Sequence, residues 1–232
     1  MRKIAIIPAR GGSKRIPRKN IKDFLGKPII SYSIECAKKS RLFDTILVST
    51  DDMEIKEIAE GLDAQVPFLR SDNTSDDHAT TADVIEEVIN CLADKYDYYD
   101  HVCCLYPTAP LLDPAKINES FELMIKGKFD SVFPVVRYSY PIQRSLAFVD
   151  HKIHMVDKKY ELKRSQDLEE RFHDAGQFYW LSVKGFLKHK KLFTENSSAI
   201  VLDELSVQDI DNPSDWKIAE LKYKLIKSLQ EG

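Results

Sequence analysis

The segment IPARGGSKRIPRKN spans residues 7–20 and follows directly on the apolar residues 4–6. A short apolar run of this kind is typical of a buried strand, so the segment begins where a strand ends. It contains no carboxylate and five cations, which are Arg10, Lys14, Arg15, Arg18 and Lys19. Gly11 and Gly12 allow the backbone to approach an anion closely, and the hydroxyl of Ser13 adds a donor. The pattern predicts a phosphate-binding loop after a strand.

This basic loop, residues 10–20, differs from the two common phosphate-binding motifs. It matches neither GxxxxGK[ST] nor GxGxxG, which excludes the usual ATPase and dinucleotide loops. The alternative interpretation is a solvated basic turn without a ligand. Cations at close spacing repel one another, so a bound polyanion accounts for their clustering better than solvent does.

Outward from the loop, short apolar runs alternate with amphipathic helical patterns along most of the chain. Strands are expected at residues 4–7, 44–50, 64–68, 101–106, 130–136, 177–183 and 199–202. Helices are expected at residues 28–40, 53–61, 80–96, 113–126, 184–190 and 213–229. This alternation is typical of an α/β protein with a mainly parallel mixed sheet covered on both faces, a three-layer α/β/α Rossmann-like fold. Ligands of such folds bind at the carboxyl ends of the strands, where the basic loop lies.

The regular alternation stops between about residues 138 and 171. Residues 146–149 and 152–156 predict a hairpin that turns at Asp150 and His151, and the remainder of this excursion is polar. We therefore expect a single domain over residues 1–232, with the excursion inserted into it.

Bulk composition excludes several classes of function. The chain has 232 residues, 43% of them apolar, which suits one substantial core. A net charge of −3 provides no overall attraction to nucleic acid or to an anionic membrane, so neither is an expected partner. The four cysteines show no CxxC spacing, and no apolar run approaches roughly 18 residues. We expect a soluble, cytoplasmic protein.

Eight ordered sequence blocks indicate a known family. After PARGGSKR they are STDD, VPFLR, TTADV, YPTAP, RSQDL, HDAGQFYW and VQDIDNPSDW, and together they cover nearly the whole chain. Their order resembles the cytidylyltransferases that activate nonulosonic acids, the CMP-sialic acid synthetase family. The resemblance implies a nucleotidyltransferase form of the Rossmann-like fold, with CTP as substrate and a homodimer in which the excursion forms the interface. It also implies a divalent cation, Mg²⁺ or alternatively Mn²⁺.

The resemblance further implies which residues bind the triphosphate of CTP. They lie in and beside the basic loop, at Ala9, Arg10, Gly11, Gly12, Ser13, Lys14, Lys19 and Asn20. Lys19 and Arg10 would also act in catalysis, because phosphoryl transfer is accelerated mainly by positioning and by stabilising charge at the reacting phosphate.

The resemblance places the cytosine base against the YPTAP turn. The predicted base site comprises Pro107, Thr108, Ala109, Arg70, Ala79, Thr80 and the neighbouring Thr81. Discrimination of cytosine from uracil requires hydrogen bonds from a rigid pocket, which a turn with two prolines can provide. Taken alone, YPTAP is equally an ordinary strand-to-helix turn, and Arg70 a surface cation.

Asp209 and Asp211 are the predicted metal ligands and complete the predicted catalytic set. They stand two residues apart on the same side of an extended segment. The alternative is that DIDNPSD only caps the last helix, through Asp211 or Asn212. Asp52 in the STDD block also follows a strand, and helix capping is its preferred interpretation.

The acceptor, a sugar acid, requires a cation for its carboxylate. By resemblance, Arg164 supplies this cation from the excursion, by crossing a dimer interface into the partner's site. Gln143 and Arg144 are weaker candidates from the same region, with a surface loop as the alternative. The other predicted acceptor contacts are Tyr106, His173, Gln177 and Tyr179. A core or supporting role is the alternative for His173.

Two positions indicate which acid is the acceptor. Family members that act on sialic acid usually carry glutamine and asparagine where this chain has Tyr106 and Ala175. The loss of two amides favours a less hydroxylated, more apolar acceptor. The runs FHDAGQFYW and KRSQDLE resemble the branch of the family that uses pseudaminic acid.

We therefore expect CTP and pseudaminic acid to give CMP-pseudaminic acid and pyrophosphate, for glycan or flagellin glycosylation. The alternatives are the same reaction on N-acetylneuraminic, legionaminic or 3-deoxy-manno-octulosonic acid. A non-catalytic nucleotide-binding module is an alternative of another class.

Overall fold

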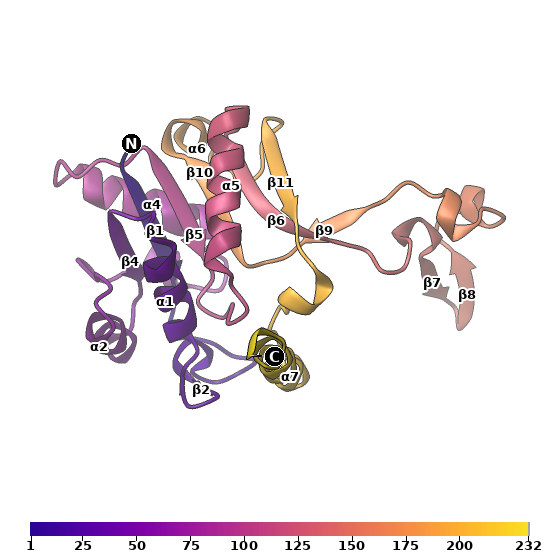
Figure 1. The fold of residues 1–232 in the computed structure, drawn as a ribbon, viewed down its shortest axis with the longest axis horizontal. Helices are drawn as coiled ribbons and strands as arrows, with labels where there is room; N and C mark the ends of the chain where they lie inside the picture. Colours follow the sequence, from indigo (N-terminus) through magenta and orange to yellow (C-terminus); the bar gives the residue numbers. More distant parts are fainter. Residues whose placement is uncertain (232) are drawn as a thin grey trace.

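A mixed seven-stranded sheet forms the centre of the protein in the computed structural model, which describes residues 1–231. Its strands are β1 (Lys3–Pro8), β4 (Thr45–Ser49), β5 (His101–Leu105), β6 (Ser131–Arg137), β9 (Phe172–Asp174), β10 (Phe178–Ser182) and β11 (Ser197–Val201). They follow the order β11-β6-β10-β5-β1-β4, and β9 pairs with β6 (Figure 1). β1 is parallel to β4 and β5, and β11 is parallel to β6, whereas β10 is antiparallel to both of its neighbours. The predicted mainly parallel mixed sheet is confirmed.

Helices cover both faces of this sheet. α1 (Ile30–Ser40), α2 (Met53–Gly61) and α5 (Pro114–Gly127) pack on one face, and α4 (Thr81–Ala93) and α6 (Val183–His189) pack on the other. Successive side chains of a strand point to opposite faces, so Ala5 and Ile7 join the first core cluster while Ile4 and Ile6 join the second. The structure therefore confirms the predicted three-layer α/β/α fold.

Polar side chains begin three of these helices, and at α2 the structure confirms the predicted cap by Asp52. Asp52 caps α2 by accepting a hydrogen bond from the amide of Ile55, and Asp113 caps α5 ahead of Pro114. At α4, Thr80 forms a capping box with Asp83. These caps fix the points at which the chain leaves the carboxyl edge of the sheet.

A third, smaller core joins the basic loop to the C-terminal segment. Ile16 from the loop and Phe24 from β2 (Asp23–Phe24) pack with Ile210 and Trp216, together with residues of α1. Trp216 belongs to α7 (Pro213–Glu231), which Figure 1 shows beside β2 and below the sheet. This contact brings two segments that are about two hundred residues apart in sequence to the same edge of the molecule.

The excursion extends away from the body of the protein (Figure 1). Its hairpin of β7 (Leu146–Val149) and β8 (Lys152–Met155) is confirmed, with positive φ angles at Asp150 and His151. Three short 3-10 turns complete it, η2 (Ile142–Arg144), η3 (Lys158–Tyr160) and η4 (Ser165–Asp167). Its fully or largely exposed apolar side chains include Tyr140, Leu146, Phe148, Val156 and Leu162.

The predicted strand at residues 64–68 is wrong. Only Gln65 bridges the sheet, through backbone hydrogen bonds with Ile46 and Val48, and Pro67 has no amide proton with which to continue the pairing. The sequence also did not predict β2, β3 (Lys27–Pro28), β9, the short helix α3 (Asp72–Ser75), or the 3-10 turns η1 (Lys19–Ile21) and η5 (Glu204–Ser206). Within residues 1–231, no helix has the length and apolar character needed to cross a bilayer.

Candidate functional site

A pocket of about 430 Å³ opens where β1 and β5 end, and we call it the basic pocket. Its lining comprises Pro8, Arg10, Ser13, Lys14, Arg15, Lys19, Asn20, Arg70, Asp77, Ala79, Thr80, Thr81, Val84, Tyr106, Pro107 and Thr108. Most residues predicted for the triphosphate and the base therefore meet around one hollow. Ala9 and Ala109 are buried, and neither they nor Gly11 and Gly12 are among the side chains that line it in the described part of the chain.

The cations of the basic loop find carboxylate partners that are distant in sequence. Arg10 binds Asp77 at 3.0 Å and also donates to the backbone carbonyl of Asp76 at 2.6 Å. Lys14 pairs with the same Asp77, and the guanidinium of Arg15 lies 2.7 Å from Asp211. Asp77 and Asp211 thus bind three cations of the basic loop, and a phosphate chain could replace these carboxylates.

Lys19 connects the basic loop to the C-terminal aspartates. Its ammonium group donates to the carbonyl oxygen of Ile210 at 2.7 Å and lies 3.9 Å from Asp211. Burial lowers the pKa of Lys19, and the nearby charges of Asp211 and Asp209 act in the opposite direction. A cation with only 20% of its side chain exposed has already lost much of its hydration, so it interacts strongly with a charge placed beside it.

Asp209 and Asp211 lie close enough for their charges to interact. Partial burial raises the pKa of Asp209, and the neighbouring charge of Asp211 raises it further. A bound cation would remove this repulsion. Residues 1–231 contain no group of three or more Asp, Glu, His or Cys side chains arranged to hold a metal. Mg²⁺ that binds together with a nucleotide typically needs only one or two carboxylates from the protein, because phosphates and water supply its other ligands.

The capping alternative named Asp211 or Asn212, and the structure shows Asn212 in that role. The side-chain oxygen of Asn212 accepts hydrogen bonds from the amides of Ser214 and Asp215, at 2.9 and 3.1 Å. Asn212 therefore caps α7, and the carboxylate of Asp211 faces Arg15 and Lys19 instead.

Arg70 forms a rigid part of the pocket wall. Its guanidinium donates to the backbone and hydroxyl oxygens of Ser49, at 2.6 and 3.1 Å, and to the carbonyl of Thr74 at 3.3 Å. Burial lowers the pKa of Arg70, which the charges of Asp51 and Glu87 partly offset. Arg70 is therefore no surface cation. A buried donor held at fixed oxygens can present its remaining N–H groups to a base in one orientation.

A second hollow of about 460 Å³ adjoins the aspartates, and we call it the aspartate pocket. It is lined by Val136, Arg137, Tyr138, Ser139, Tyr140, His173, Asp174, Ala175, Glu204, Val207, Gln208, Asp209 and Lys222. It contains the predicted acceptor residue His173 and the predicted metal ligand Asp209. The sequence did not single out Tyr138 and Lys222, which lie outside the eight blocks, or Asp174, which lies within HDAGQFYW but was not given a role. The adjacency of HD in the HDAGQ block is the one signal that pointed to Asp174.

Four polar side chains connect the walls of the two pockets. The hydroxyl of Tyr106 lies 3.1 Å from that of Thr81, and the ring of Tyr106 lies against that of Tyr179, with centroids 5.5 Å apart. The Tyr179 hydroxyl donates to Asp174 at 2.6 Å. Burial is the main cause that raises the pKa of both tyrosines, so both stay protonated donors at neutral pH.

Gln177, Tyr179 and Arg164 lie outside both pocket linings in residues 1–231. Gln177 is buried and donates to the carbonyl of Ser206 at 2.6 Å, and Tyr179 is also buried. Arg164 is exposed in the excursion, 3.3 Å from Asp167. Nearby, Gln143 donates to the carbonyl of Glu169, and Arg144 lies at the limit of hydrogen-bonding distance from Ser165. Direct acceptor contact by these residues stays a prediction.

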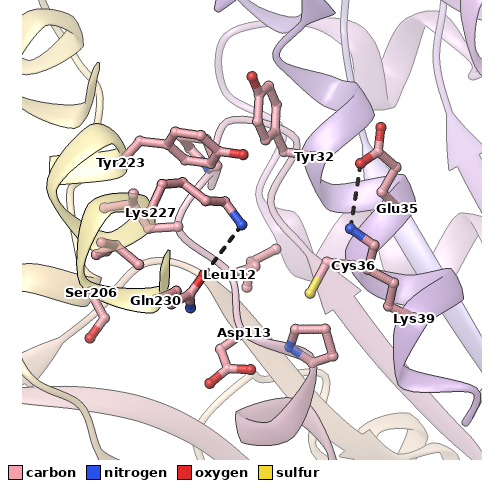
Figure 2. Close-up of a pocket in the computed structure, with 14 residues that line it drawn as sticks. Tyr32, Glu35, Cys36, Lys39, Leu112, Asp113, Ser206, Tyr223, Lys227 and Gln230 are labelled. Atoms are coloured by element: carbon pink, nitrogen blue, oxygen red, sulfur yellow. Dashed lines mark hydrogen bonds and ion pairs between the residues drawn. The ribbon is translucent and has the colours of Figure 1, made fainter. Parts of the chain in front are cut away.

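A third hollow, of about 320 Å³, lies between α1, the start of α5 and α7 (Figure 2). Lys227 contacts Gln230 along α7, and Glu35 pairs with Lys39 along α1. Burial raises the pKa of the Cys36 thiol to about 12, so this cysteine is not a thiolate nucleophile. Its lining, within residues 1–231, contains none of the predicted site residues.

A basic loop and two aspartates at the carboxyl edge of a mainly parallel sheet define a nucleotide-binding α/β protein of the nucleotidyltransferase class. The model of the cytidylyltransferase family matches residues 4–211. The chain belongs to this cytidylyltransferase family.

Individual relatives agree with that assignment. A pseudaminic acid cytidylyltransferase of Campylobacter jejuni subsp. jejuni is 45% identical over 226 residues, which cover 97% of each chain. A CMP-N,N'-diacetyllegionaminic acid synthase of Legionella pneumophila is 35% identical, covering 100% of this chain and 99% of that protein. Among solved structures, a CMP:2-keto-3-deoxy-manno-octonic acid synthetase complexed with CTP superposes with a TM-score of 0.71, covering 98% of this chain and all of the other. Its identity is 15%, so that likeness concerns the fold.

Proposed function

We propose that the protein transfers CMP from CTP to the anomeric 2-hydroxyl of pseudaminic acid and releases pyrophosphate. The observation that carries this proposal is the position of Lys19, whose ammonium joins the basic loop to the Asp209–Asp211 segment. The relative that is 45% identical over almost its full length acts, by its name, on pseudaminic acid, which supports that acceptor.

CTP would bind in the basic pocket. A triphosphate carries about four negative charges, and it would displace Asp77 from Arg10 and Lys14, while Lys19 keeps its hydrogen bond to the carbonyl of Ile210. The cytosine would lie between the buried Arg70 and the turn at Pro107 and Thr108. These turn and guanidinium groups do not need to rearrange, which favours selection of one base over another.

Mg²⁺ would be held by Asp209 and Asp211, with Mn²⁺ as an alternative, and the phosphates would complete its coordination. When bound, it would lower the pKa of the acceptor hydroxyl and offset charge on the phosphates. Removal of the metal with a chelator is expected to abolish pyrophosphate release.

The transfer would proceed by direct attack of the acceptor hydroxyl on the α-phosphorus of CTP. A new bond forms between the anomeric oxygen and phosphorus, the bond from the α-phosphorus to the bridging oxygen breaks, and pyrophosphate leaves with the electron pair. The hydroxyl proton passes to solvent. Lys19, already fixed on the carbonyl of Ile210, would stabilise the charge that develops on the α-phosphate oxygens.

The acceptor would occupy the aspartate pocket, on the other side of Asp209. We infer that the 138–171 excursion of this single domain pairs with a second copy of the chain, and that Arg164 acts in the partner's aspartate pocket. The exposed Phe148 (77%) and Leu162 (97%) support this inference, because side chains of this size are usually covered at an interface. Arg164 would provide the cation for the acceptor carboxylate.

The test is to offer CTP and Mg²⁺ with each of four acids and to measure pyrophosphate. Pseudaminic acid is expected to give the highest kcat/KM. Faster turnover with N-acetylneuraminic, legionaminic or 3-deoxy-manno-octulosonic acid would show that this acid is the acceptor, and the proposed reaction type would stand. CTP binding without pyrophosphate release from any acid would favour a non-catalytic nucleotide-binding module.

A further inference from the structure

Arg18 differs from the other cations of the basic loop. Arg10, Lys14, Arg15 and Lys19 line the basic pocket, whereas Arg18 lies outside that lining in the described chain. Its charge is therefore not directed at the site where a triphosphate would bind, and its position in the loop requires another explanation.

The guanidinium of Arg18 binds two carboxylates where β4 is followed by α2. One of its terminal nitrogens donates to Oδ2 of Asp52, and the other donates to Oδ1 of the same carboxylate at 3.0 Å and to Glu54. This two-point geometry fixes the plane of the guanidinium as well as its distance. Asp52 cannot turn away easily, because its Oδ1 also caps α2 by accepting from the amide of Ile55 at 3.0 Å.

The backbone of Arg18 sets the direction of the residues that follow it. Arg18 adopts a left-handed conformation, with φ 55° and ψ 31°, which side chains other than glycine seldom adopt. Its carbonyl accepts hydrogen bonds from the amides of Ile21 and Lys22, both at 3.0 Å, and so closes the turn η1. η1 carries Lys19 toward Ile210 and lets Asn20 donate to the carbonyl of Arg10 at 2.9 Å.

The same strand end holds the start of the basic loop. Oδ1 of Asp51 accepts from the amide of Gly11 at 2.8 Å. A Cβ added at Gly11 would lie 2.6 Å from Oδ2 of Asp52, so only glycine permits this approach. Asp51 and Asp52 thus hold the basic loop near both of its ends, at Gly11 and at Arg18.

We propose that the Arg18–Asp52 pair is a positioning device for Lys19, which aligns its ammonium group with the reacting phosphate. Arg18 and Asp52 are positioning residues, because they act through η1 and touch neither the pocket nor the aspartates of the site. This role rests on the proposed function for its kinetic consequence, but the order that the pair imposes on the basic loop exists without catalysis.

The decisive variant is Asp52→Asn. Asparagine is as good a helix cap as aspartate, so the variant keeps the cap of α2 while it removes the charge that Arg18 binds. We expect kcat to fall about tenfold, since a small misplacement of a catalytic group is costly, while the Kd for CTP changes less than about threefold. Arg18→Gln is expected to behave in the same way, and Arg18→Lys to recover part of kcat.

The matched control is Glu57→Gln, which removes one carboxylate from an exposed position of the same helix. It is expected to leave kcat and CTP binding unchanged. If Asp52→Asn behaves like Glu57→Gln, the positioning role is wrong. If Asp52→Asn instead lowers CTP affinity as much as kcat, the pair supports binding in general and the proposal also fails.

A readout independent of catalysis separates this proposal from the proposed function. Trypsin cleaves after Lys and Arg, and Asp52→Asn leaves every such site of the basic loop in place. We expect cleavage within residues 10–19 of the folded variant to be several times faster than in the unaltered chain or in Glu57→Gln. Unaltered cleavage rates would overturn the proposal even if the enzyme activity were different from the one proposed.

Discussion

At the residue scale, the fold fixes the position of the Lys19 ammonium group and partly buries it. Its ammonium is held by the carbonyl of Ile210 and by the charge of Asp211, in a position where burial has lowered its pKa. In the proposed reaction, its largest effect would be on the transition state, because charge on the α-phosphate oxygens increases during transfer.

The first prediction is that Lys19→Ala lowers kcat about 100-fold, the usual cost of losing one preorganised donor at a developing charge. The Kd for CTP should change less than about fivefold, since Arg10 and Lys14 remain in the basic pocket. Steady-state kinetics and calorimetric titration of CTP measure the two quantities. Lys224→Ala, at an exposed position of α7, serves as the charge-matched control. A variant with unchanged kcat would remove Lys19 from the mechanism.

The sequence predicted the cations that line the basic pocket, but it did not predict the residues that form ion pairs with them. Arg10, Lys19 and Arg70 belong to recognisable blocks, and the structure brings them together. Asp77 was missed because ion pairing across a pocket leaves no local spacing in the sequence. The position of Arg164 relative to a site is not predictable from one chain, because the proposed partner of that residue belongs to another subunit.

At the scale of elements, residues 76–77, which follow α3, occupy cations of the basic loop that a triphosphate would need. Asp77 binds both Arg10 and Lys14, and Asp76 contributes its carbonyl to Arg10. A triphosphate that enters the basic pocket must displace or share these groups.

The second prediction is that Asp77→Asn lowers the KM for CTP about two- to fivefold, which is the range expected for removing a partly exposed competing ion pair. The side chain of Asp77 is 42% exposed, so solvent already weakens the pair. Asp72→Asn, an exposed change in α3 of the same segment, should leave KM unaltered. A higher KM in Asp77→Asn would mean that Asp77 organises the pocket rather than competing with the nucleotide.

The third prediction concerns the small core that joins the basic loop to α7. Ile210 is fully buried between Ile16, Phe24 and Trp216, and its carbonyl accepts from Lys19. Ile210→Ala should lower the free energy of unfolding by about 2–4 kcal/mol, as cavity-forming changes of this kind do. Its kcat should fall even at temperatures where the variant is fully folded, because the backbone that holds Lys19 shifts.

Denaturant unfolding and kinetics on the folded variant test this prediction. Val201→Ala, at a position that is 57% exposed, is the control and should cost well under about 1 kcal/mol. If Ile210→Ala lost stability and kept its kcat, the small core would stabilise the fold without orienting the site.

The sequence predicted most elements because their signals are local. Apolar periodicity identified β1, β4 and β5, and the capping residue Asp52 marked the start of α2. The predicted strand at residues 64–68 is wrong because a short apolar run favours a strand whether or not the segment pairs with a neighbouring strand. The short β2–β3 and β9 pairings depend on tertiary contacts that no periodicity reports.

At the scale of the whole molecule, the excursion gives the chain two unequal parts. The body contains the basic pocket and the aspartate pocket, whereas the excursion extends from it and exposes apolar side chains (Figure 1). Arg164 is 76% exposed and lies outside both pockets of its own chain as the structure describes it. A site completed by the partner's excursion would reconcile these facts.

The fourth prediction tests that arrangement by mixing subunits. Lys19→Ala and Arg164→Ala proteins should each be nearly inactive, for different reasons. In a dimer that contains one of each, the Arg164→Ala subunit has an intact Lys19 and would receive Arg164 from its partner. Random pairing makes about half of the dimers mixed, with one of two sites intact, so co-expression should restore about a quarter of the normal activity per site.

If Arg164 acted on its own subunit, every site in the mixture would lack one of the two cations, and no activity would return. Recovery near a quarter, together with a dimeric mass in solution, would therefore place Arg164 in the partner's site, whereas an inactive mixture of intact dimers would contradict it.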